Sequence, residues 1–161
     1  MKILVSACLL GVNCKYDGSN NRDEALIRLL EGHELHTVCP EVLGGLSSPR
    51  DPAEIRDNCV VCEDGRSVDR EFRAGAAAGL ALARKVQPDL VILKSRSPSC
   101  GAGEIYDGTF THTRIPGDGV FAALCRAEGF RVITDEEAPR LLSENALPSE
   151  DAAAQKGCCH D

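Results

Sequence analysis

The chain has 161 residues, a length that fits one domain of ordinary size. Hydrophobic residues make up 43% and charged residues 27%, which excludes general disorder and collagen-like repeats. The net charge of −7 argues against a large interface with nucleic-acid phosphates, and no run of ~20 apolar residues is present to cross a membrane. We therefore expect a cytoplasmic protein with a small-molecule partner, and with neither a nucleic-acid polymer nor a membrane as partner.

Short apolar runs predict strands, in chain order, at residues 2–7, 35–38, 90–93 and 131–133. Helical spacing of apolar residues predicts helices between them, at residues 22–31, 69–86 and 118–128. A last short helix is expected after Thr134-x-x-Glu137, which resembles a capping box. The stretches 40–66 and 95–117 are rich in Gly and Pro and are expected to be loops.

This alternation of strands and helices is typical of an α/β fold. We expect a three-layer, Rossmann-like sandwich with a mainly parallel sheet of about four to five strands. Residues 1–142 are predicted to form a single domain, and residues 143–161 a flexible polar tail because large apolar residues become rare there.

Cysteine is unusually frequent, with nine residues, and three of them directly follow predicted strands: Cys8, Cys39 and Cys100. Because parallel strands end at one edge of a sheet, where such folds bind ligands, we expect these three thiols to converge. Thiolates select zinc, copper(I) or iron–sulfur clusters, and a set of three leaves one metal position open for a substrate. Cys14 is an alternative fourth ligand. It would close the site and make the chain a non-catalytic metal-binding or iron–sulfur-binding domain.

The other cysteines have simpler interpretations. Cys59-x-x-Cys62 lies in a predicted loop, and we favour the interpretation that this pair has no chemical role. The rival hypothesis is a thiol-based redox protein that uses Cys59 and Cys62. Cys125 falls on the apolar face of its helix and is expected in the core. Cys158 and Cys159 belong to the predicted tail.

Four phrases surround the converging cysteines: SACLLG at 6–11, CPE at 39–41, KSRSPSCG at 94–101 and IYDGTF at 105–110. In this order they resemble the thiouracil desulfurase (TudS) family, long catalogued as a domain of unknown function, over residues 2–137. The resemblance implies an enzyme with a [4Fe–4S] cluster held by Cys8, Cys39 and Cys100. The fourth iron would take the sulfur of a thiocarbonyl substrate. It also implies catalytic roles for Glu41 and Ser97.

The implied reaction is a non-redox desulfuration of a thiolated nucleobase or a related small thiocarbonyl compound, in which water replaces sulfur. Glu41 is the candidate general base, and Ser97 is expected to bind developing charge or relay a proton. Arg50 and Lys94 are predicted to bind the substrate, with surface ion pairs as the alternative. Tyr16 is predicted to stack on the substrate ring, with an ordinary half-buried tyrosine as the alternative.

Overall fold

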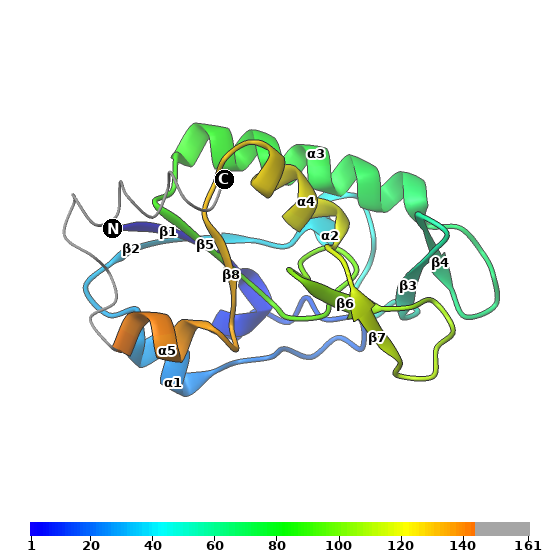
Figure 1. The fold of residues 1–161 in the computed structure, drawn as a ribbon, viewed down its shortest axis with the longest axis horizontal. Helices are drawn as coiled ribbons and strands as arrows, with labels where there is room; N and C mark the ends of the chain where they lie inside the picture. The colour runs from blue at the N-terminus through cyan, green and yellow to red at the C-terminus, as the bar shows by residue number, and fades with distance from the viewer. Residues whose placement is uncertain (144–161) are drawn as a thin grey trace.

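A four-stranded parallel sheet forms the centre of the computed structural model, which describes residues 1–143 (Figure 1). Its strands, in the spatial order β2-β1-β5-β8, are Glu34–Val38, Lys2–Ser6, Leu90–Leu93 and Val132–Thr134. All three pairings are parallel, so the strands end at the same edge. Most of the predicted polar tail, with Cys158 and Cys159, lies outside the described residues.

Helices cover both faces of this sheet, because successive strand residues point to opposite sides. On β1, Leu4 packs with Phe72 and Phe121, which belong to α3 (Asp69–Val86) and α4 (Val120–Ala127). Ile3 and Val5 face the other way, toward α1 (Glu24–Leu29) and α5 (Ala138–Ser143). Figure 1 shows these two helix pairs on opposite sides of the sheet. The predicted α/β class and parallel sheet are confirmed, with four strands.

Both predicted long loops contain regular structure, which corrects the sequence-based assignment. The first holds α2 (Pro40–Leu43) and an antiparallel hairpin of β3 (Ala53–Arg56) and β4 (Cys59–Cys62). The second holds a hairpin of β6 (Glu104–Tyr106) and β7 (Arg114–Pro116). Asp57 and Asn58 form the two-residue turn between β3 and β4, with φ values of 50° and 62°. Positive φ at both positions is typical of a type I′ turn, which joins the strands of a hairpin. The hairpin was not predicted from the sequence because its strands have only four residues each.

Helix ends follow local hydrogen bonding. The predicted capping box is confirmed, since Thr134 N donates to Glu137 Oε1 at 3.0 Å and Glu137 N donates to Thr134 Oγ1 at 3.2 Å. The helix predicted from residue 118 begins at Val120, because Asp118 instead accepts a hydrogen bond from Gly103 N at 2.7 Å. No helix within residues 1–143 has both the length and the apolar character needed to cross a bilayer.

The backbones of α2 and α3 touch at two glycines. A Cβ atom placed on Gly75 would lie 1.8 Å from the carbonyl oxygen of Pro40, and one on Gly44 would lie 2.0 Å from that of Glu71. No real Cβ contact is this short, so only glycine permits the close approach. This contact seats α2, which carries Glu41, directly on the longest helix.

We expect Gly75→Ala to lower the free energy of unfolding by about 1–3 kcal/mol through overpacking, although alanine is the better helix former. Urea titration measures this change. Ala78→Gly, at an exposed position of the same helix, is the matched control and should cost only about 1 kcal/mol. A stabilised Gly75→Ala variant would show that the two helices do not depend on this contact.

Candidate active site

A cavity of about 400 Å³ opens at the carboxyl edge of the sheet. This volume lies within the range of small-molecule sites, about 300–1,000 Å³. Every residue that the sequence predicted for the site contributes to its lining: Cys8, Tyr16, Cys39, Glu41, Arg50, Lys94, Ser97 and Cys100. The sheet topology thus brings together side chains that are separated by up to 92 residues in the sequence.

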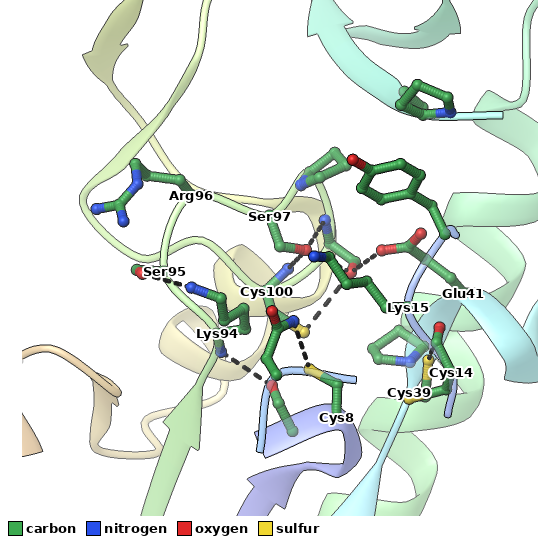
Figure 2. Close-up of a pocket in the computed structure, with 18 of the residues that line it drawn as sticks. Cys8, Cys14, Lys15, Cys39, Glu41, Lys94, Ser95, Arg96, Ser97 and Cys100 are labelled. Atoms are coloured by element: carbon green, nitrogen blue, oxygen red, sulfur yellow. Dashed lines mark hydrogen bonds between the residues drawn. The ribbon is translucent and has the colours of Figure 1, made fainter. Parts of the chain in front are cut away.

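Three cysteines reach the cavity from three consecutive positions in the sheet (Figure 2). Cys8 lies in a 3-10 turn, η1 (Ala7–Leu10), that directly follows β1 and ends at Gly11, whose φ of 97° suits glycine. Cys39 separates β2 from α2, where the following Pro40 occupies the first helical position. Cys100 lies in the turn after β5 and is only 4% exposed.

Cys14 also lines the cavity and contacts two members of the trio. Hydrogen bonding to the Cys14 thiol lowers the pKa of Cys8 and of Cys39, and the same contacts raise the pKa of Cys14. The structure therefore places Cys14 in the same cavity, beside Cys8 and Cys39.

Cys100 differs from the other two members. Burial raises the pKa of its thiol to about 12, and a hydrogen bond from Ser6 opposes this effect. Metal ligands bind as thiolates, so loading the site releases the Cys100 proton.

The donor set fits an iron–sulfur cluster. Cys8, Cys39 and Cys100 supply soft sulfur from three separate segments. Within the part of the chain that the structure describes, no group of three His, Cys, Asp or Glu side chains could hold one metal ion. A cluster takes each thiolate on a different iron atom, so three thiols from three separate segments are a suitable donor set.

Glu41 is held at both carboxylate oxygens. Arg50 Nε lies 3.1 Å and Arg50 Nη2 lies 3.0 Å from Oε1, and Ser99 Oγ donates to Oε2 at 2.8 Å. The side chains of Glu41 and Arg50 are 15% and 9% exposed, so this is a largely buried ion pair. The carboxylate therefore faces the cavity in one fixed orientation.

The Arg50 guanidinium is occupied by the protein itself. Nη1 donates to Ser47 O at 3.0 Å and to Ser48 Oγ at 2.7 Å, and Nη2 donates to Cys14 O at 2.8 Å. Together with Glu41, these contacts engage all three nitrogen atoms. Arg50 thus ties the loop after α2 to Glu41 and to the segment that carries Cys14.

Ser97 holds the turn that carries Cys100. Its Oγ accepts hydrogen bonds from Ser99 N at 3.1 Å and from Cys100 N at 3.0 Å. This is the turn role that a serine before proline often takes, and it orients the hydroxyl within the cavity lining.

Two predicted substrate contacts remain partly accessible. Lys94 Nζ lies 3.3 Å from Ser95 Oγ and 3.6 Å from Asp135 Oδ2, and its side chain is 26% exposed. Tyr16 is 42% exposed, and Lys15 Nζ lies 5.6 Å from its ring centroid. Both side chains are available at the cavity surface.

Sequence reasoning missed several lining residues. Tyr106 and His112 reach the cavity from the β6–β7 hairpin, where their rings meet edge to face at 6.1 Å. Ser99 is 1% exposed and bonds Glu41, from which it is 58 residues distant in the sequence. Tyr106 could have been predicted from its place in the IYDGTF phrase, and Ser99 from its place next to Cys100.

The remaining cysteines lie elsewhere. Cys59 and Cys62 are on strand β4, three residues apart, so their side chains point to opposite faces and their Cα atoms are roughly 10 Å apart. Since a disulfide requires less than about 7 Å, the redox-pair hypothesis is wrong. Cys125 is fully buried among core residues, as predicted.

Three comparisons place the chain among known proteins. A family profile described as 2-thiouracil desulfurase matches residues 3–137. The uncharacterized protein YbbK of Bacillus subtilis (strain 168) is 42% identical over 150 residues, which cover 87% of this chain and 99% of that protein. A solved structure of the [4Fe–4S]-dependent thiouracil desulfidase TudS (DUF523Vcz) is 41% identical and has a TM-score of 0.81. The match covers 91% of this chain and 99% of that one. The chain therefore belongs to the 2-thiouracil desulfurase family.

Proposed function

We propose that this chain is a [4Fe–4S]-dependent enzyme that removes sulfur from 2-thiouracil or a closely related small thiocarbonyl compound. One observation carries the proposal: three thiols, a fixed carboxylate and a serine line a single cavity, in a chain 41% identical to a thiouracil desulfidase over nearly its whole length. The volume of about 400 Å³ suits a small molecule and not a nucleic-acid polymer. We place the enzyme in the cytoplasm, where thiols stay reduced.

In this proposal Cys8, Cys39 and Cys100 hold the cluster. When bound with one iron free of protein ligands, the cluster supplies a Lewis acid for the soft thiocarbonyl sulfur. Water adds its oxygen to the thiocarbonyl carbon, the carbon–sulfur bond breaks and the sulfur leaves as hydrogen sulfide. The products together contain the atoms of substrate and water, so no external oxidant or reductant is needed.

The chain's own residues act on the water and on the heterocycle. Glu41 takes a proton from the attacking water, because a carboxylate keeps free lone pairs even with one hydrogen bond on each oxygen. Lys94 supplies positive charge beside a polar substrate atom, and Tyr16 covers the ring. Arg50 is engaged with Glu41, Cys14, Ser47 and Ser48, so we assign it to positioning Glu41 in place of the substrate contact predicted from sequence.

A second candidate is a closed, non-catalytic iron–sulfur site in which Cys14 is the fourth ligand. The contacts between the Cys14 thiol and both Cys8 and Cys39 favour it. Activity and ligand count separate the two candidates.

We expect the protein, reconstituted with iron and sulfide under anaerobic conditions, to release sulfide from 2-thiouracil and to yield uracil. Colorimetric sulfide assay and chromatography of the product measure this. The same protein without iron is the control and should be inactive. A fully loaded protein that releases no sulfide would refute the enzymatic function.

We expect Cys8→Ser, Cys39→Ser and Cys100→Ser to abolish stable iron binding, because each removes one of three thiolates. Cys14→Ser should retain both iron and activity. Iron content per chain after anaerobic gel filtration gives the answer. Loss of iron in Cys14→Ser would instead support the closed, four-cysteine site.

We expect Arg50→Met to lower the free energy of unfolding by roughly 3–5 kcal/mol, since it leaves the buried Glu41 carboxylate without its ion-pair partner. Arg84→Met is the matched control, because Arg84 pairs with Glu128 at a 57% exposed position and its loss should change stability much less. Anaerobic urea titration compares them. Equal effects of the two substitutions would show that the buried Glu41–Arg50 pair contributes no more to stability than an exposed ion pair.

A further inference from the structure

We propose that Ser99 is a positioning residue that links Glu41 to Ser97 and makes the two act as one unit. The inference rests on the proposed function, because it assigns Ser99 through Glu41, the proposed base, and through Ser97, for which the family resemblance implies a catalytic role. The sequence does not predict a contact between Ser99 and Glu41, because the two are 58 residues apart. Glu41 lies in α2, and Ser99 lies in the turn after β5.

The geometry of the link is direct. Ser99 Oγ lies 2.8 Å from Glu41 Oε2 and 3.0 Å from Ser97 Oγ. The residue is 1% exposed, so water does not compete for these contacts. Figure 2 shows Glu41 and Ser97 above the cysteines, with dashed contacts running between the two segments.

Counting donors fixes the direction of every hydrogen in this chain. The Ser97 oxygen already accepts from two backbone N–H groups, those of Ser99 and Cys100, which uses both of its lone pairs. Ser97 must therefore donate its hydroxyl hydrogen to Ser99. Ser99 has one hydrogen and directs it to the Glu41 carboxylate at 2.8 Å, since the alternative acceptor, Cys100 Sγ, is farther away at 3.6 Å.

The result is a one-way chain of hydrogen bonds from Ser97 through Ser99 to Glu41. Arg50 holds Oε1 of the carboxylate, and Ser99 holds Oε2. Removing the Ser99 hydroxyl frees one carboxylate oxygen and takes away the acceptor of the Ser97 hydrogen. Glu41 then keeps only its contacts with Arg50, and the hydroxyl hydrogen of Ser97 loses its fixed direction.

The backbone of Ser99 has a separate, structural task. Its carbonyl oxygen accepts from Phe121 N at 2.9 Å and from Ala122 N at 3.1 Å at the start of α4. Substitution of the side chain leaves these bonds in place. Ser99→Ala therefore removes the link while keeping the turn and the helix attached.

We expect Ser99→Ala in the reconstituted enzyme to lower kcat roughly 10- to 100-fold, the usual loss when a group that orients a reacting residue is removed. KM for 2-thiouracil, iron content per chain and the absorption spectrum of the cluster should not change. Cys125→Ala, a truncation at a fully buried position outside the cavity, is the control for lost stability and should keep the wild-type kcat.

The sharper readout is a double-mutant cycle with Ser97→Ala. If the residues form one unit, the double variant loses no more activity than the more damaging single variant. Losses that multiply would contradict the link, as would a wild-type kcat in Ser99→Ala. Loss of iron from Ser99→Ala would also contradict it, since the inference gives Ser99 no part in holding the cluster. An inactive wild-type enzyme would instead refute the proposed function.

Discussion

The parallel pairing of β1 with both β2 and β5 is the constraint on which the active site depends. It aligns Ser6 with Val38 and Val5 with Ile92, so the three strands end together and their next residues enter the same space. Antiparallel order would place alternate strand ends on opposite edges. The apolar clusters on both faces fix the register, because a shift by one residue would move each buried side chain into the cluster on the opposite face.

Contacts between α2, α3 and the loops at this edge also hold the active-site residues in place, in addition to the strands. The close approach of Gly75 to Pro40 seats α2 on α3, and the buried Glu41–Arg50 pair joins α2 to the loop that follows it. Ser99 then joins α2 to the turn after β5. Preorganisation of this kind places reacting groups without cost at the moment of reaction, which is where much of an enzyme's rate acceleration arises.

Local pattern was enough to predict the elements with strong signals. Buried β5 is an unbroken apolar run, and Thr134 with Glu137 carries its capping pattern in the sequence. The strands of the two hairpins, at three or four residues each, were too short to show a period. The residues lining the cavity were predictable because strand ends share an edge and the phrases around them resemble a known family. The hydrogen-bond partners of Arg50 and Ser99 could not be predicted from the sequence, because only tertiary packing decides which carboxylate a buried donor contacts.

The central claim is an iron–sulfur site with three protein ligands, open toward Glu41 and Ser97. A crystal structure of the anaerobically reconstituted protein tests it most directly. The account predicts a [4Fe–4S] cluster bound by Cys8, Cys39 and Cys100, with one iron free of protein ligands and facing the cavity. Coordination of that iron by Cys14, or a metal bound outside this cavity, would contradict it.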